Sequence, residues 1–113
     1  MKKKTIQSLT MFIPVSQLDA TWNGQLDKLP ANQTFDLIID YPFGGEHEYH
    51  FPIKTGKRGL GLMGLLNKIG KAYAKIYNDP DKYQVFGHDI GDLQLEGIKV
   101  NFKTKRIRLS IGS

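Results

Sequence analysis

Residues 54–77 read KTGKRGLGLMGLLNKIGKAYAKIY, and they contain the strongest secondary-structure signal in the chain. Apolar side chains recur there at spacings of three and four, which is typical of one face of an α-helix. The sequence Asn78-Asp79-Pro80 follows and predicts the end of the helix, because proline cannot continue it. The predicted apolar stripe consists of Leu62, Leu65, Leu66, Ile69, Tyr73, Ile76 and Tyr77.

The same stretch contains glycines at the spacing of a dinucleotide-binding fingerprint, Gly59-x-Gly61-x-x-Gly64. That fingerprint requires a parallel strand before the glycines and an acidic residue about twenty positions later, on the next strand. Here an antiparallel hairpin is predicted before the glycines and the loop NDPDKYQVFG after the helix. We therefore assign Gly64 and Gly70 to close packing, and we expect alanine at Gly64 or Gly70 to lower stability and phosphate to have no effect that depends on Gly59 or Gly61. A looser anion site stays open as an alternative, formed by the amides of the helix start with Lys54, Lys57 and Arg58.

The N-terminal part of the chain alternates apolar and polar residues. Leu9, Met11, Ile13 and Val15 recur at period two, which predicts a half-buried strand rather than a signal peptide. Residues 16–30 leave two alternatives open, a short helical turn or a loop.

Residues 35–54 predict a first hairpin with one apolar face. A three-residue loop, GGE, keeps that face apolar throughout, and it pairs Ile39 with Phe51. The same register sets Asp40 beside His50, a contact that would raise the pKa of the histidine. Each strand also contains a proline, which lacks a ladder donor and predicts an edge or bulged position.

Residues 93–111 predict a second hairpin, with a loop at residues 103–106 that sets Ile98 opposite Ile111. The apolar phase changes before Gly97, which predicts a β-bulge there. The predicted fold class is α+β: an antiparallel sheet of about five strands, made of two hairpins and an N-terminal strand, with one amphipathic helix packed across it.

Length and composition bound the class of protein. The chain has 113 residues, 40% of them hydrophobic and 24% charged, which predicts a single globular domain over residues 1–113. It has no cysteine, which excludes disulfides and thiolate chemistry and fits a cytoplasmic location. No apolar run approaches the ~18 residues of a membrane span, and no motif indicates a cofactor or a metal.

Basic residues are concentrated in the second half of a chain whose net charge is +5. Residues 54–78 and 99–113 contain no acidic side chain. If the helix and the last hairpin are neighbours, these segments form one basic surface that can bind nucleic-acid phosphates; otherwise they are solvated faces. The candidate residues are Lys54, Lys57, Arg58, Lys68, Lys71, Lys75, Lys103, Lys105, Arg106 and Arg108.

Candidate catalytic residues are few. His88, Asp89 and Asp92 occur together in the sequence GHDIGD, where they can act as acid and base or simply cap a turn. His47 and His50 fall on opposite faces of one strand and therefore cannot bind one metal together.

The sequence as a whole favours a non-enzymatic interaction module that binds a protein partner or a second copy of itself. The reasons are that no catalytic constellation appears and that two hairpins and one helix leave sheet edges exposed. The binding surface is either such a strand edge or the tyrosine-rich side of the helix. A nucleic-acid-binding protein using the basic helix and C-terminal hairpin is the alternative, and an enzyme with a site at His88, Asp89 and Asp92 is the weaker one. The identity of the partner and the oligomeric state stay open.

Overall fold

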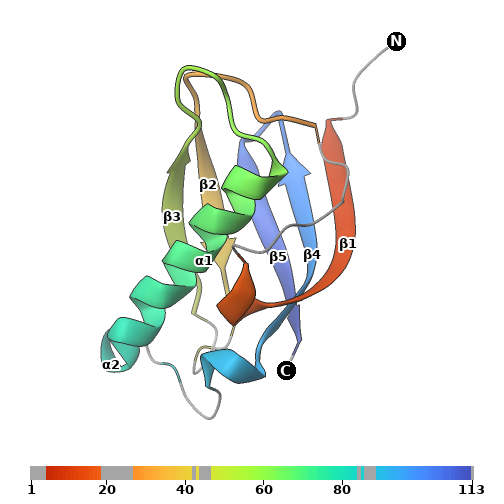
Figure 1. Ribbon diagram of the computed structural model, residues 1–113. Helices are drawn as coiled ribbons and strands as arrows, with labels where there is room; N and C mark the ends of the chain where they lie inside the picture. The colour runs from red at the N-terminus through yellow and green to blue at the C-terminus, as the bar shows by residue number, and fades with distance from the viewer. Residues whose placement is uncertain are drawn as a thin grey trace.

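The computed structural model describes residues 5–18, 27–41, 43, 47–83, 85 and 89–112. A five-stranded sheet forms one layer, and one long helix lies across one of its faces (Figure 1). The elements in chain order are β1 (Ile6–Pro14), the 3₁₀ turn η1 (Val15–Gln17), β2 (Thr34–Ile39), β3 (Tyr49–Lys54), α1 (Leu62–Asn78), α2 (Pro80–Tyr83), the 3₁₀ turn η2 (Ile90–Asp92), β4 (Gln94–Asn101) and β5 (Arg106–Gly112).

The sheet is mixed, so the prediction of a purely antiparallel sheet is wrong. Its strand order is β1-β4-β5-β2-β3, and the pair β2–β5 is parallel while the other three pairs are antiparallel. The reason is the length of α1, whose 17 residues span about 25 Å and return the chain to the end of the sheet where β3 begins. Strands β3 and β4 therefore run in the same direction, and their hairpin partners β2 and β5 do so too (Figure 1).

Helix α1 and its apolar stripe are as predicted. The helix ends at Asn78, and the N–H of Asp79 donates to the carbonyl of Ile76 just before Pro80. Leu62 and Tyr77 lie at the ends of the stripe and are partly buried, whereas its middle is fully buried against the sheet. The shared core includes Met11, Phe35, Leu37, Ile53, Leu65, Leu66, Ile69, Tyr73, Ile76, Leu95, Val100 and Ile107.

Both hairpins keep the predicted faces but not the predicted register. Ile39 pairs with Tyr49 rather than Phe51, and Ile98 pairs with Leu109 rather than Ile111, a shift of two residues in each case. A shift of two leaves every side chain on its own face, because strand side chains alternate with period two. The predicted bulge before Gly97 is confirmed.

The turns explain the shifts. In the second hairpin the side-chain oxygen of Asn101 accepts the N–H groups of Lys103 and Thr104, each at 3.0 Å, so the strand ends at Asn101 and Phe102 belongs to the turn. In the first hairpin the strands end at Ile39 and begin at Tyr49; the predicted GGE loop lies outside the described residues.

The N-terminal strand is confirmed as β1, and it ends in the short helical turn η1. Residues 19–26, the centre of the segment left open above, lie outside the described residues. After them the chain forms an isolated bridge between Leu29 and Leu60, which ties it to the segment before α1. Among the helices that the structure describes, none is long and apolar enough to cross a membrane.

Candidate interaction site

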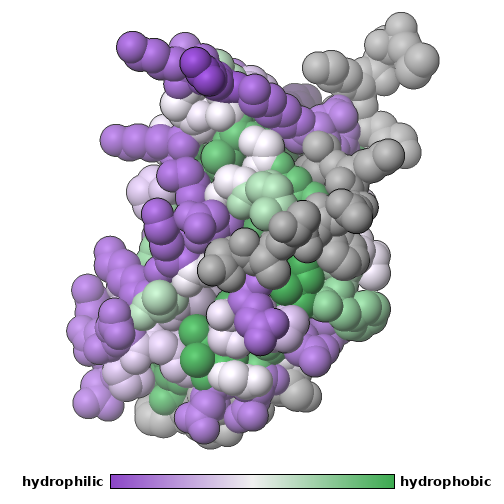
Figure 2. All heavy atoms as spheres, in the orientation of Figure 1, coloured by the Kyte–Doolittle hydropathy of each residue, from purple (hydrophilic) through white to green (hydrophobic). Residues whose placement is uncertain are grey.

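The predicted basic residues divide between two sides of the sheet. Ile107 points into the core beneath α1, so its exposed neighbours Arg106 and Arg108 point to the opposite side, which we call the open face. Lys71 and Lys75 are exposed on α1, on the side shown in Figure 2, where hydrophilic side chains gather over the helix. The helix and the last hairpin therefore do not present their charges on one surface.

Lys68 also lies on α1, where it is partly buried. The remaining predicted basic residues lie at one end of the sheet. Lys54 ends β3, and its exposed position has the same strand phase as His50 on the open face. The other four are Lys57 and Arg58 in the exposed turn after β3, and Lys103 and Lys105 in the β4–β5 turn.

The glycines of the predicted motif and of the helix differ in their surroundings. Gly59 has a φ of +76°, and a Cβ built there would overlap the carbonyl oxygen of Leu29. Gly61 has open space around it, so a Cβ fits at Gly61 but not at Gly59. In α1, a Cβ at Gly64 would meet Leu60 Cδ1 at 2.6 Å, and one at Gly70 would meet Leu18 Cβ at 3.4 Å. No side chain caps the start of the helix.

The two aspartates of the candidate catalytic group cap a turn. The backbone N–H of Asp89 donates to a carboxylate oxygen of Asp92 at 3.2 Å, and the N–H of Asp92 donates back to the carbonyl of Asp89 at 2.9 Å. The Asp92 carboxylate thereby caps the start of η2, and Asp89 accepts through its backbone carbonyl. His88 lies outside the described residues. No group of three or more metal-ligating side chains occurs in the part of the chain that the structure describes.

An ionic network crosses the open face from β2 to β5. His50 Nδ1 lies 2.7 Å from an oxygen of Asp36, and its Nε2 lies 3.2 Å from Glu48, which in turn lies 3.7 Å from Arg108. The hydrogen bond to Asp36 raises the pKa of His50 above its ordinary value of 6.5. The carboxylate beside His50 is therefore Asp36 rather than the predicted Asp40. The register shift of two residues removes Asp40 from the position opposite His50, and Asp36 contacts the ring from a diagonal position. Ile38 lies directly opposite His50 in the β2–β3 ladder. Its side chain is buried, with only 2% of its surface exposed.

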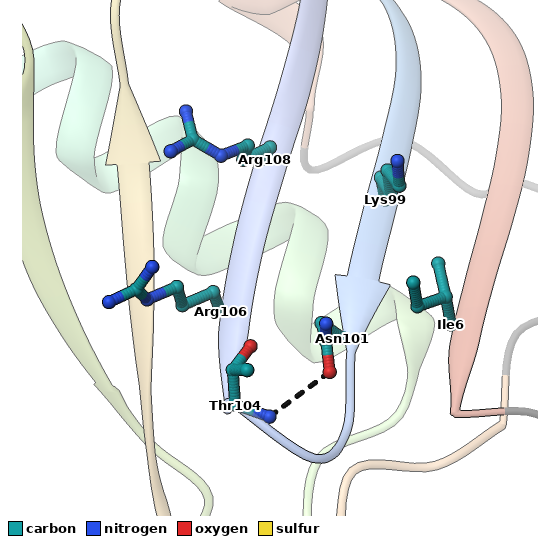
Figure 3. Close-up of a pocket in the computed structure, with 6 residues that line it drawn as sticks. All are labelled: Ile6, Lys99, Asn101, Thr104, Arg106 and Arg108. Carbon is teal, nitrogen blue, oxygen red and sulfur yellow. Dashed lines mark hydrogen bonds between the residues drawn. The ribbon is translucent and has the colours of Figure 1, made fainter.

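A shallow hollow of about 230 Å³ lies on the open face beside this network. Figure 3 views it with α1 behind the strands, and the side chains that line it come from β1, β4, β5 and the β4–β5 turn. They are Ile6, Lys99, Asn101, Thr104, Arg106 and Arg108. Lysine and arginine supply the only charged side chains of this lining, and no carboxylate contributes to it.

The sheet has two edges, β1 and β3, and they differ in composition. β3 has six residues and contains His50, Pro52 and Lys54, whereas the nine residues of β1 carry no charge. β1 also exposes two large apolar side chains, Phe12 at 68% and Ile6 at 44%. Within the described residues, no strand pairs with the outer side of β1.

Sequence reasoning missed the open-face residues Lys99, Asn101 and Thr104 and the edge residues Ile6 and Phe12. A signal was present for the first group, because Lys99 and Asn101 have the phase opposite to the apolar residues of their strand. That β1 is an edge depends on strand order, which its own sequence does not specify.

No protein-family model matches the chain, and neither the curated proteins nor the solved structures give a match.

Proposed function

We propose that this protein is a non-enzymatic interaction module, and that its edge strand β1 pairs with β1 of a second copy. The observation that carries the proposal is an edge strand of nine residues without a charge and with Phe12 68% exposed. Natural edge strands are commonly protected by charged side chains, proline or short length. β1 lacks a charge and is long; it has a register shift between Thr10 and Ile13, and Pro14 stands at its last position.

Pairing of two copies is compatible with the chemistry of β1. An antiparallel β1–β1 pair is symmetric, so each strand satisfies backbone groups of the other. Because β1 has no charged side chain, no like charges meet across the pair. Phe12 and Ile6 of both copies lose exposed apolar surface, which favours association.

The expected strength of this dimer is modest. One pair of short strands buries less than the ~1,200 Å² of total surface that a standard stable interface requires. We therefore expect a concentration-dependent dimer with a dissociation constant on the order of micromolar. The absence of cysteine agrees with a module that works in the cytoplasm.

The test is sedimentation velocity over a range of concentrations, with a charge placed on the edge. The wild-type chain should shift from monomer to dimer, and Phe12→Lys should remain monomeric, because each copy would bring a lysine to the edge in place of an apolar side chain. Met63→Lys is the matched control: it places the same charge at an exposed apolar position, 41% exposed, on α1. It should dimerise like the wild type. A wild-type chain that stays monomeric at the highest concentration, or equal loss of dimer in both variants, overturns the proposal.

A further inference from the structure

The hollow on the open face offers hydrogen-bond donors without a competing carboxylate. Three of its six lining residues, Lys99, Arg106 and Arg108, are cations. Among the described residues, Lys99 and Arg106 form no ion pair, and Arg108 contacts Glu48 at 3.7 Å. An anion that enters the hollow therefore meets two cations that form no ion pair among the described residues; the ladder partner of Arg106, Asp36, is paired with His50 instead.

The neutral lining residues are also oriented as donors. The side-chain oxygen of Asn101 is held by the backbone N–H groups of Lys103 and Thr104, so its amide NH₂ group is turned away from the turn. Figure 3 shows this bond to Thr104 and the Asn101 nitrogen on the other side of the side chain. The Thr104 side chain adds a hydroxyl to the same lining.

A second hollow, of about 370 Å³, continues from the first across β5 toward β2 and β3. The two share Thr104 and Arg106, and the second adds Lys105. Asp36 also lines it, but the carboxylate of Asp36 is engaged by His50 at 2.7 Å. Two adjoining hollows with a shared arginine suit a chain of anions better than a single small one.

From these features we infer that the open face binds the phosphodiester backbone of a nucleic acid, independently of base sequence, with Lys99 and Arg106 as the main contacts. Arginine and lysine are the side chains that bind phosphate oxygens, and such contacts position a nucleic acid without reading its bases. No aromatic side chain lines the first hollow, so it offers no platform for base stacking. The net charge of +5 favours approach of a polyanion. The inference is independent of pairing at β1.

The experiment is fluorescence anisotropy with labelled single-stranded and duplex oligonucleotides of random sequence, titrated at several salt concentrations. The test variants are Arg106→Gln and Lys99→Gln, both on the open face. The matched controls are Lys71→Gln and Lys75→Gln, which make the same change of charge on α1, across the sheet. Circular dichroism melting of every variant establishes that it is folded.

Binding should weaken steeply with salt, and each open-face variant should reduce the slope of log K against log salt by about 0.7–0.9, the value for one phosphate contact. The helix variants should leave that slope unchanged. Three results would overturn the inference: no binding at low salt, equal effects of open-face and helix variants, or discrimination among base sequences that exceeds the effect of Arg106→Gln.

Inorganic phosphate and pyrophosphate form a separate arm, which distinguishes a small anion from a backbone. We expect both anions to compete only weakly with the oligonucleotide, because each can occupy only one of the phosphate positions along the two hollows. Tight binding of pyrophosphate together with no binding of either oligonucleotide would assign the hollow to a small phosphate ligand and overturn the backbone inference.

Discussion

The two edge strands, β1 and β3, differ in how they are protected against pairing with another chain. β3 is short and contains a proline within the strand, and His50 and Lys54 add polar or charged side chains to it. β1 has nine residues, no charge and an exposed phenylalanine. An unpaired edge offers backbone donors and acceptors to any extended chain. Charge, proline within the strand and short length protect β3, whereas β1 has a register shift between Thr10 and Ile13 and a proline at its last position. If the protein simply tolerated unpaired edges, both strands would lack protection. The contrast between them therefore favours a role for β1 in pairing with another strand.

The edges also differ in how the chain beside them is held. On the β3 side, Thr55 donates its N–H to the carbonyl of Gln33 at 2.9 Å, and Leu29 and Leu60 then exchange two backbone bonds. On the β1 side, the segment at Asp27 is held by the Gln7 side chain, which bonds to the carboxylate and to the backbone N–H of Asp27 at exposed positions. Substitutions on the β3 side should therefore cost more stability than those on the β1 side.

The largest effect is expected for Gly59→Ala, where the chain leaves β3. Alanine would have to adopt a φ of +76° and would overlap the carbonyl of Leu29. Left-handed strain and overpacking together should lower the free energy of unfolding by roughly 2–5 kcal/mol, measured by urea denaturation. Gly61→Ala, with open space around it, is the control and should change it by less than about 1 kcal/mol. Equal effects at the two glycines would contradict this account of the β3 side.

A smaller loss is expected for Tyr73→Phe, which acts on the segment between β2 and β3. The buried hydroxyl of Tyr73 donates to the carbonyl of Tyr41 at 2.9 Å, and burial raises the pKa of this phenol. Phenylalanine keeps the packing but removes the donor, which should destabilise the protein by about 1–2 kcal/mol. Thermal melting measures the loss, and Tyr77→Phe, on the partly buried end of α1, is the comparison. A Tyr73→Phe melt unchanged from wild type would show that this bond adds no stability.

Much of the fold follows from periodicity in the sequence. The predictions that were wrong concern pairing between strands, which depends on contacts between different segments. Apolar spacing predicts α1, the strand faces and the bulge before Gly97, because these depend on residues within one segment. The register of each hairpin does not follow, since a shift of two residues preserves both faces and the choice depends on turn contacts such as that of Asn101 with Thr104.

The mixed pairing was also within reach of physical reasoning. A helix as long as α1 returns the chain across the sheet, which makes β3 and β4 run in the same direction and sets β2 parallel to β5. The candidate sites were harder to predict, because they depend on which strands become neighbours. Lys99 and Arg106 lie on adjacent strands and line one hollow, whereas Lys71 has the same charge on the other side of the sheet.

On the β1 side, Gln7→Met should have a modest effect. The Gln7 amide donates to Asp27 Oδ2 at 2.6 Å, and its oxygen accepts the Asp27 N–H at 2.9 Å, both in exposed positions. Because water replaces exposed hydrogen bonds, we expect a loss of only about 0.5–1 kcal/mol by urea denaturation. Ser8→Ala, at the next exposed position of β1, controls for a general effect of changing this strand. A loss as large as that of Gly59→Ala would remove the difference between the two sides.

The smallest effect is expected for the charge of His50 on the protected edge. Its pKa is raised in the folded protein, first by the hydrogen bond to Asp36 and further by Glu48. The stabilisation is therefore fully present below the unfolded value of 6.5 and is lost as pH rises through the higher folded pKa. Because the His50 side chain is 49% exposed, solvent screens the pair, and the gain at low pH should be only about 0.2–0.5 kcal/mol.

The measurement is the difference in unfolding free energy between wild type and His50→Gln at slightly acid and at alkaline pH, with an NMR titration of the imidazole. His47→Gln is the control, since His47 has no ion pair among the described residues. A difference that grows toward alkaline pH, or an imidazole that titrates below 6.5, would mean that the Asp36–His50 pair does not form in solution.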